Sequence, residues 1–260
     1  MNTQQEYFDY YARLQKLIVQ ASSVIAQTTE KQFRTKRTND FVSAVDIGIE
    51  KYICSQLQEI TPYIPILGEE GTQTSDAPTR WIIDPLDGTT NFMHGIPHFA
   101  ISVALEVDNQ VLFGCSYDVS KNELFHAFRG HGAYMNNQSI HVSAVTQISE
   151  ALMGTGFPYD RHLKAQEYLQ YVEKCMKKSQ GIRRFGAATL DLAYVAMGRL
   201  DGFWEFGLQP WDVAVGILLV EEAGGVISDL DNNPVDINHP TIVASASSLL
   251  HNEIIHTLTT

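Results

Sequence analysis

The spacing of apolar residues changes near residue 142, and this change constrains the fold more than any other feature. Before it, two helix patterns are followed by a series of strand patterns; after it, strand and helix patterns alternate to the C-terminus. Consecutive strands predict a mixed or antiparallel sheet, whereas alternation is typical of an α/β arrangement. We therefore predict an N-terminal α+β subdomain (residues 1–142) and a C-terminal α/β subdomain (residues 143–260). Since no long linker separates them, we expect the two parts to share a cleft.

The first part begins with two helix patterns. Apolar residues recur at spacings of three and four in segments 7–25 and 46–60, which predicts two amphipathic helices. A short apolar run at 64–67 predicts a strand that ends at Gly68. Three further segments predict the strands of a meander: 100–107, 111–117 and 123–127.

The second part alternates between short β-prone runs and helix patterns. The predicted strands are 152–155, 182–185, 202–205, 226–228 and 241–244. The predicted helices are 166–178, 190–197, 213–223 and 249–258.

Composition narrows the classes of function. The formal net charge of −12 argues against a protein that covers nucleic-acid phosphates with cations. No apolar stretch approaches the roughly 18 residues of a membrane span, and no signal-peptide pattern opens the chain, so we expect a cytoplasmic protein. Its three cysteines lie far apart, which predicts buried reduced thiols.

Segment 81–91, WIIDPLDGTTN, joins a strand pattern to a glycine turn. Its first three residues are large and β-prone, Asp84 and Pro85 are expected to end the strand, and Gly88 allows a sharp turn. Two carboxylates, Asp84 and Asp87, thus stand where a strand becomes a turn. Such a place can hold a metal ion and a phosphate together.

Acidic residues also follow two other predicted elements. Glu69 and Glu70 follow Gly68, and Asp212 precedes a predicted helix. Each group alone has an ordinary explanation: a solvated turn, an Asp-Gly turn, or, for Asp212, the N-cap of its helix. All of them nevertheless fall at ends of strands or starts of helices, where a fold can bring them together.

Gathering these carboxylates requires compensating positive charge. Two carboxylates about 4 Å apart repel by roughly 4 kcal/mol at an effective dielectric near 20. Oxygen ligands without a supporting histidine or cysteine cluster favour Mg²⁺ or Mn²⁺ over zinc. His94 and His98 are separated by Gly95 and Pro97, and we expect them to be structural.

The glycine turn supplies groups for an anion. Backbone N–H groups at Gly88, Thr89 and Thr90, leading into a helix, could bind a phosphate against the metal ions. Asp46, at the start of the second helix, could orient the Thr89 hydroxyl towards an attacking water. These groups together predict metal-assisted phosphoryl transfer to water.

The segment DPLDGT superficially resembles the DxDGT signature of haloacid-dehalogenase-type phosphatases, in which the first Asp is the nucleophile. Here two residues, Pro85 and Leu86, separate the carboxylates, and about 80 residues precede the motif. We therefore expect Asp87 to be a metal ligand and neither Asp to be phosphorylated.

Three motifs in order, GEE (68–70), WIIDPLDGTTNF (81–92) and PWDVA (210–214), resemble the inositol monophosphatase family of metal-dependent, lithium-sensitive phosphatases. Their order and spacing are similar to the bacterial inositol-1-monophosphatase branch. Supporting segments include TGFP (155–158) and RRFGAATLDLAYVAMGRLDGFWE (183–205). The resemblance implies a layered αβαβα sandwich and a homodimer.

The resemblance also implies roles for individual residues. The first Mg²⁺ would be held by Glu69, Asp84 and the Leu86 carbonyl. The second would be held by Asp84, Asp87 and Asp212, and Glu69 could share a weaker third ion. The nucleophilic water would be polarised by Asp46, Thr89 and Glu69.

Substrate contacts follow from the same resemblance. The substrate-binding residues would be Asp87, Gly88, Thr89, Thr90, Arg183, Ala188, Glu205 and Asp212. Arg183 could instead lie at the dimer interface or be a surface charge. Ala187 stands where relatives commonly have Ser or Thr, which leaves the preferred polyol open.

The sequence thus predicts a Mg²⁺-dependent phosphatase for a small polyol monophosphate, foremost myo-inositol 1-phosphate. Related members act on fructose 1,6-bisphosphate, 3′-phosphoadenosine 5′-phosphate or histidinol phosphate, and the metal site does not distinguish among them. Some bacterial relatives resemble transcription antitermination components, so a transcription-factor partner with retained catalysis is the alternative. We expect no membrane and no direct nucleic-acid partner.

Overall fold

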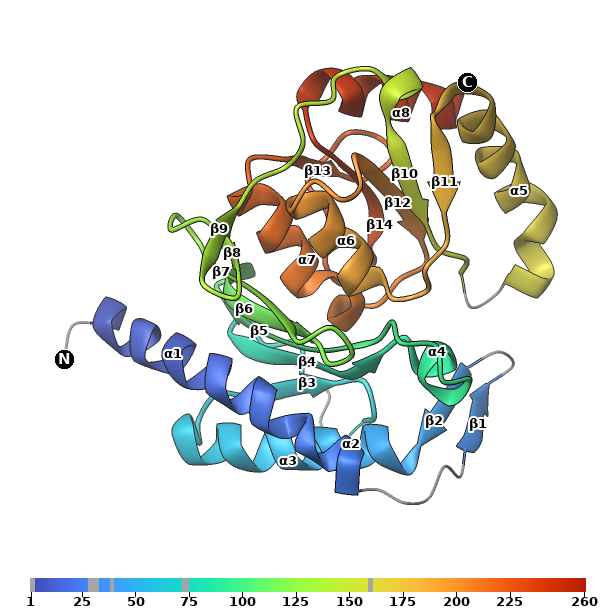
Figure 1. Cartoon of the computed structure of the whole chain (residues 1–260). Helices are drawn as coiled ribbons and strands as arrows, with labels where there is room; N and C mark the ends of the chain where they lie inside the picture. Colours follow the sequence, from blue (N-terminus) through green and yellow to red (C-terminus); the bar gives the residue numbers. More distant parts are fainter. Residues whose placement is uncertain (1–2, 28–32, 38–39, 72–74, 159–160) are drawn as a thin grey trace.

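The computed structural model describes residues 3–27, 33–37, 40–71, 75–158 and 161–260. At residues 3, 26–27, 33–37, 40–43 and 161 it describes the backbone alone. Helices and sheets stack in five layers, so the αβαβα sandwich implied by the resemblance is confirmed (Figure 1).

The first outer layer contains α1 (Thr3–Ala21), α2 (Ser23–Gln27) and α3 (Ala44–Ile60). A single helix was expected over 7–25, and that prediction is wrong because the helix is interrupted at Ser22. The Ser22 hydroxyl donates to the Val19 carbonyl at 2.7 Å, an alternative to continued helical hydrogen bonding. Apolar residues of α1 and α3, such as Leu14, Ile18 and Ile53, are buried against the first sheet.

That sheet has seven strands in sequence order. They are β3 (Ile66–Gly68), β4 (Arg80–Asp87), β5 (Ala100–Val107), β6 (Gln110–Asp118), β7 (Glu123–Phe128), β8 (Ala133–Met135) and β9 (Gln138–Ile140). Among the described strands of this sheet, β3 and β4 alone pair in parallel; the other neighbours are antiparallel, as expected for a mixed sheet. Both faces are covered, because Trp81 and Ile83 pack against the outer helices and Ile82 packs against the middle layer.

The sequence analysis expected strand β4 to end at Asp84 and Pro85, and this prediction is wrong. The strand continues to Asp87, and its pairing with β5 shifts register between Asp84 and Asp87. A bulge tolerates Pro85 because the ladder there does not need the missing N–H group. This bulge lies directly between the two acidic residues of the motif.

The middle layer consists of α6 (Ala188–Ala196) and α7 (Pro210–Glu222). Every residue of α6 is buried, and α7 contacts β4, β5, β6, β7 and β8 of the first sheet and β13 of the second. A helix covered on all sides must be apolar almost throughout, which explains why both helices lack a polar face. Buried carboxylates inside this layer, Asp191 and Asp212, are therefore exceptional.

The second sheet has five strands in the order β11-β10-β12-β14-β13. They are β10 (Leu152–Thr155), β11 (Gly181–Arg183), β12 (Gly202–Phe206), β13 (Val226–Ser228) and β14 (Thr241–Ser245). β10 is parallel to β11 and β12, whereas β14 is antiparallel to β12 and β13. The outer helices α5 (Arg161–Lys178) and α8 (Ser248–Thr259) cover its far face (Figure 1).

The helix expected after the Gly88 turn is α4 (Thr89–Met93). The sequence analysis missed five short elements: the strands β1 (Phe33–Arg37) and β2 (Asp40–Ser43), which form a hairpin, the strands β8 and β9, and a 3-10 turn at Ile148–Glu150. Each is at most five residues long, too short for a periodic pattern. The two sheets lie on either side of residue 142 in sequence, but the proposed subdomain boundary stays a prediction.

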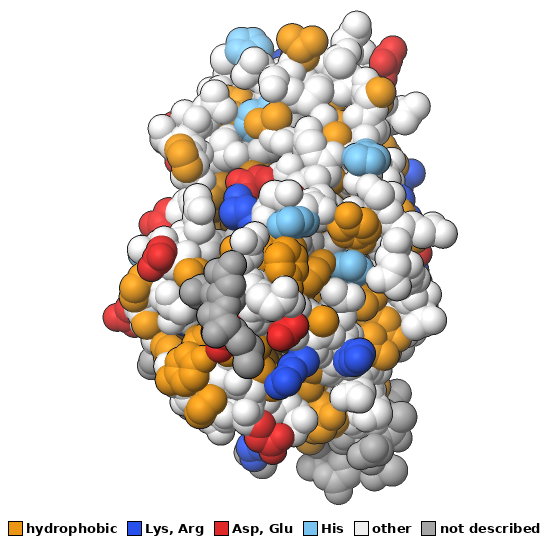
Figure 2. Space-filling view, turned by 90° about the vertical axis from the view of Figure 1, so that its left-hand side faces the viewer, with side chains coloured by type: hydrophobic (Ala, Val, Ile, Leu, Met, Phe, Trp, Pro, Cys, Tyr) orange, Lys and Arg blue, Asp and Glu red, His pale blue; other side chains and the backbone are white. Residues whose placement is uncertain are grey.

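None of the described helices has the length and apolar character needed to cross a membrane. Cys54, Cys115 and Cys175 are buried, as expected, and none of the three forms a disulfide bond. Figure 2 shows a face on which basic, acidic and hydrophobic side chains are interspersed. This mixture differs from the basic band with which proteins commonly cover nucleic-acid phosphates.

Candidate active site

One pocket of about 370 Å³ gathers residues from both halves of the chain. It lies where β4 ends and where α4, α6 and α7 begin. Ten of the predicted site residues line it: Glu69, Asp84, Leu86, Asp87, Gly88, Thr89, Thr90, Ala188, Glu205 and Asp212. Two others, Asp46 and Arg183, do not.

Asp46 lies behind the pocket and reaches it through Thr89. The Thr89 hydroxyl lies 3.1 Å from Asp46 Oδ1 and 2.9 Å from the Leu86 carbonyl oxygen. A hydroxyl has one proton, so these two oxygens compete for it. Asp46 is fully buried in the first turn of α3, and this fixes its orientation towards Thr89.

Gly88 permits the turn from β4 into α4. Its φ of 87° is in the left-handed region, and a Cβ atom there would lie 2.9 Å from the His98 carbonyl oxygen. Any other residue would be strained and would also collide with backbone. The same turn brings Thr89 and Thr90 to the pocket.

Asp87 faces the beginning of α6. Its Oδ2 accepts a hydrogen bond of 2.8 Å from the Thr189 backbone N–H. Burial raises the pKa of Asp87 to about 6, although the N–H groups of Thr189 and Ala188 and the charge of Arg184 act in the opposite direction. The start of α6 therefore holds a carboxylate of the first half.

One interpretation of the sequence made Asp212 the N-cap of α7, and this interpretation is wrong. Gln209 is the N-cap, and Asp212 occupies the third helical position, where its Oδ2 accepts from the Gln209 N–H at 2.7 Å. This reciprocal arrangement is a capping box. It fixes one oxygen of Asp212.

The carboxylates of the pocket oppose one another's ionisation. Burial raises the pKa of Asp84 well above its ordinary value, and the charges of Glu69, Asp87 and Asp212 raise it further. The pKa of Asp212 is raised by burial and then by the charge of Asp87. Groups like these are stabilised in the ionised state by a cation.

The donor set suits a hard divalent cation, since it consists of carboxylates and a backbone carbonyl. The side chains are not already closed around an ion: within the described ranges, no three His, Cys, Asp or Glu side chains form a group that could hold one. The pocket therefore brings the donors together without fixing their final coordination.

A model of the inositol monophosphatase family matches residues 7–260 of the chain. The chain belongs to the inositol monophosphatase family. It is 44% identical over 214 residues to an inositol-1-monophosphatase of Rhizobium meliloti, covering 82% of this chain and 80% of that protein. It is also 44% identical over 215 residues to the Nus factor SuhB of Pseudomonas aeruginosa, covering 80% and 79%.

Solved structures agree with this assignment. The extragenic suppressor protein suhB from Bartonella henselae superimposes with a TM-score of 0.88 at 38% identity, covering 94% of this chain and 96% of that one. An IMPase from Thermotoga maritima superimposes with a TM-score of 0.87 at 30% identity, covering 96% of each. Membership of the inositol monophosphatase family makes this chain a phosphatase.

Glu205, on β12, also lines the pocket. Burial raises the pKa of Glu205 to about 8, with Arg184 lowering it and Asp87 raising it. Gly156 makes room for this side chain, since a Cβ atom at residue 156 would lie 2.0 Å from the Glu205 carboxylate. The glycine of the segment TGFP thus leaves room for the Glu205 side chain in the pocket.

Arg183 is exposed and lies outside the pocket, and its Nη1 donates to the Ile182 carbonyl at 3.0 Å. Its predicted contact with substrate stays a prediction. Its neighbour Arg184 does line the pocket, with its guanidinium 5.4 Å from the centre of the Phe157 ring. The sequence alone does not show which of two adjacent arginines faces the pocket.

Glu50 is another residue that the sequence analysis missed. It is fully buried, its Oε2 accepts from the Glu70 N–H at 2.8 Å, and its carboxylate lies against Gly68. It therefore anchors the turn that carries Glu69. Its position four residues after Asp46, on the same face of α3, was the available signal.

Proposed function

We propose that this phosphatase is Mg²⁺-dependent and hydrolyses a small polyol monophosphate, foremost myo-inositol 1-phosphate. The observation that carries the proposal is the convergence of Glu69, Asp84, Asp87 and Asp212 beside the Gly88 turn. Five oxygen-bearing groups are available to the cations: these four carboxylates and the Leu86 carbonyl.

The proposed ligand sets follow the resemblance stated above. Glu69, Asp84 and Leu86 would hold one Mg²⁺, and Asp84, Asp87 and Asp212 would hold a second. Glu69 could share a weaker third ion, and Mn²⁺ could replace Mg²⁺. Bound ions of this kind activate a water and stabilise a leaving alkoxide.

Thr89 and Asp46 orient the nucleophilic water in this proposal, together with Glu69. When the Thr89 hydroxyl donates to Asp46 Oδ1, its oxygen can accept a hydrogen bond from water. The water is then turned with a lone pair towards phosphorus. The N–H groups of Gly88, Thr89 and Thr90 bind the phosphate.

Charge in the outer part of the pocket favours a monophosphate. Arg184 is the only Lys or Arg among the described residues that line it, and its charge acts on Asp87 and Glu205. A second phosphate would need additional cationic donors. Glu205 and Asp212, with the Ala188 backbone, are instead suited to hydroxyl groups.

A substrate panel tests this proposal. We expect phosphate release from inositol 1-phosphate in Mg²⁺, loss of activity on chelation, and inhibition by Li⁺. Asp87→Asn should abolish turnover because it removes a ligand charge. Activity that survives chelation would exclude the mechanism, and activity on a bisphosphate alone would change the substrate class.

A second candidate function is binding to a transcription factor, because relatives at 41–44% identity are named Nus factor SuhB. Catalysis and binding could coexist in one chain. If cells carrying Asp87→Asn keep the wild-type phenotype, binding is the main cellular role of the protein. If they lose that phenotype, catalysis is the main role. We further propose a cytoplasmic homodimer.

A further inference from the structure

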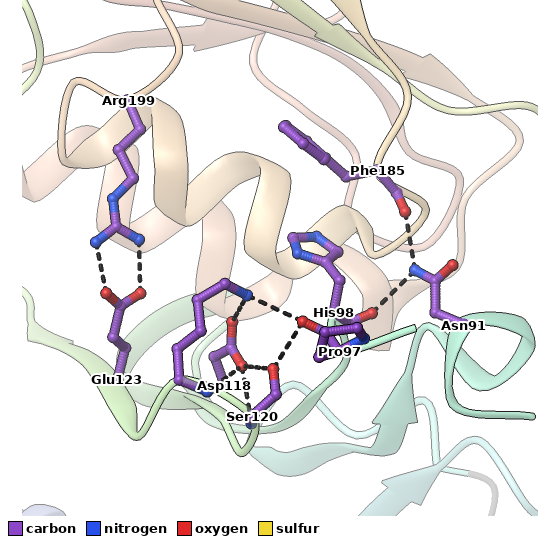
Figure 3. Close-up of polar contacts among 9 residues, drawn as sticks. Asn91, Pro97, His98, Asp118, Ser120, Glu123, Phe185 and Arg199 are labelled. Atoms are coloured by element: carbon purple, nitrogen blue, oxygen red, sulfur yellow. Dashed lines mark hydrogen bonds and ion pairs between the residues drawn. The ribbon is translucent and has the colours of Figure 1, made fainter. Parts of the chain in front are cut away.

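We propose that Asn91 is a positioning residue that fixes the phosphate turn relative to the loop before α6. Asn91 is a buried residue of α4 and follows Thr89 and Thr90 directly. Its Nδ2 donates to the His98 carbonyl at 2.9 Å and to the Phe185 carbonyl at 2.8 Å (Figure 3). A third carbonyl, that of Gly186, lies 3.4 Å away.

The amide uses both of its hydrogens on backbone oxygens from different segments. One acceptor is seven residues away in sequence, and the other is 94 residues away in the second half of the chain. A hydrogen bond to backbone fixes the path of the chain itself, whatever side chain it carries. Asn91 thus joins two halves that must keep a fixed distance across the pocket.

Both segments that Asn91 joins carry groups of the proposed site. On one side it follows the Gly88 turn. On the other side, the loop at Phe185 continues to the N–H groups of Ala188 and Thr189 that face Asp87. Displacement of this loop would move the donors to Asp87.

The same loop carries Arg184. A Cβ atom on Gly186 would lie 2.2 Å from Arg184 Nη1 and 3.4 Å from Asn91 Nδ2, so this glycine is enclosed between the two side chains. Asn91 therefore also restrains the backbone from which Arg184 enters the pocket.

The backbone before His98 is itself fixed by hydrogen bonds from residues 118–121. The Ser120 hydroxyl donates to the Pro97 carbonyl at 2.8 Å, and Asp118 binds both Ser120 and Lys121 (Figure 3). The His98 ring packs 5.1 Å from the Phe185 ring. The acceptors of Asn91 are thus fixed backbone, and the amide is the polar link between them.

The test replaces the donor without changing its shape. Asn91→Asp puts a carboxylate oxygen against three carbonyl oxygens and should push the two segments apart. Because misplacement of reacting groups by about 1 Å can cost roughly 100-fold in rate, we expect kcat/KM to fall by about 10- to 100-fold. This inference rests on the proposed function, so binding of inorganic phosphate in Mg²⁺ is also measured, and it should weaken by about tenfold.

Asn136→Asp is the matched control. The Asn136 amide also donates to a backbone carbonyl, that of Asn122 at 3.0 Å, but it lies in the turn between β8 and β9. We expect its kinetics and phosphate binding to match those of the wild type. All measurements are made well below the melting temperature of each variant and are normalised to folded protein.

A purely structural role predicts a lower melting temperature with unchanged kcat/KM and unchanged phosphate affinity, and this result would overturn the proposal. If Asn91→Asp does not fold, Asn91→Ser, which keeps one donor and adds no charge, should show a smaller loss of the same kind. A wild type without phosphatase activity would refute the proposed function instead, and phosphate binding would then decide the role of Asn91.

Discussion

Individual residues carry unfavourable charge in this fold. Asp191 is the clearest case: it is buried in α6, and neither of its carboxylate oxygens has a hydrogen-bond partner among the described residues. Burial raises its pKa well above the ordinary value, and the charges of Glu205 and Asp87 add to this effect. Such a group is costly for folding unless a bound ligand or ion compensates for it.

We expect Asp191→Asn to stabilise the metal-free protein at neutral pH. The change removes the cost of either burying this charge or protonating the carboxyl group, and should raise the free energy of unfolding by about 1–3 kcal/mol, measured by urea denaturation. Asp201→Asn is the control. Asp201 accepts hydrogen bonds from the Ser143 hydroxyl and the Leu152 N–H, so this substitution should destabilise the protein. A loss of stability in Asp191→Asn would show that this carboxylate contributes favourably.

Arg184→Met should weaken binding of a polyol phosphate. The change keeps an unbranched side chain but removes the guanidinium that lies over Phe157 and its charge near Glu205 and Asp87. We expect KM for inositol 1-phosphate to rise by about tenfold, equivalent to about 1.4 kcal/mol, with a smaller change in kcat. Arg199→Met, which breaks a distant pair with Glu123, should leave KM unchanged; an unchanged KM in Arg184→Met would exclude the contact.

At the scale of elements, the site depends on how one strand ends. The bulge in β4 places Asp84 and Asp87 together, and the turn at Gly88 then starts α4. The helices α6 and α7 begin opposite this turn. Their burial between two sheets leaves little freedom for either to move.

Gly88→Ala should disrupt this turn more than a change in backbone preference alone would. Gly88 and Gly95 both have positive φ, of 87° and 69°, but a Cβ atom at Gly95 meets nothing within 4 Å. Both variants should lose about 1 kcal/mol for the left-handed backbone. Gly88→Ala should lose more, together with activity, because of its collision with the His98 carbonyl; equal melting temperatures for the two variants would contradict this.

At the scale of the whole molecule, two halves each bring negative charge to one pocket. A carboxyl group whose pKa is raised by folding destabilises the fold above its unfolded-state value, so the cost grows as pH rises towards the folded-state value. For Asp87 that value is about 6. A bound cation relieves the cost, whereas protons compete with the cation for the same oxygens.

The increase in melting temperature on adding Mg²⁺ should therefore grow from about pH 6 to about pH 8. Neutral buried His98 and His126, whose pKa values burial lowers to about 4, destabilise the fold in acid with or without Mg²⁺. Their effect cancels when the two melting temperatures are subtracted. A shift that is absent, or that falls with pH, would argue against a carboxylate cation site.

The sequence alone determined the fold class and most residues of the pocket. Apolar periodicity predicted the long helices and the central strands because burial on one face repeats along an element. The strand-end motif with Glu69 and Asp212 predicted the donor set, because these residue types suit one class of ion. Short elements such as β8 and β9 carried too few residues for a periodic signal.

Only the tertiary structure decided which neighbours face the pocket. It separated Arg184 from Arg183, placed Asp212 inside a capping box, and showed that β4 continues through Pro85. It also revealed Glu50, Asn91 and Asp191, whose roles depend on partners far away in sequence. Residue types reveal what chemistry a chain can perform, whereas direction, burial and charge coupling arise only when distant segments pack together.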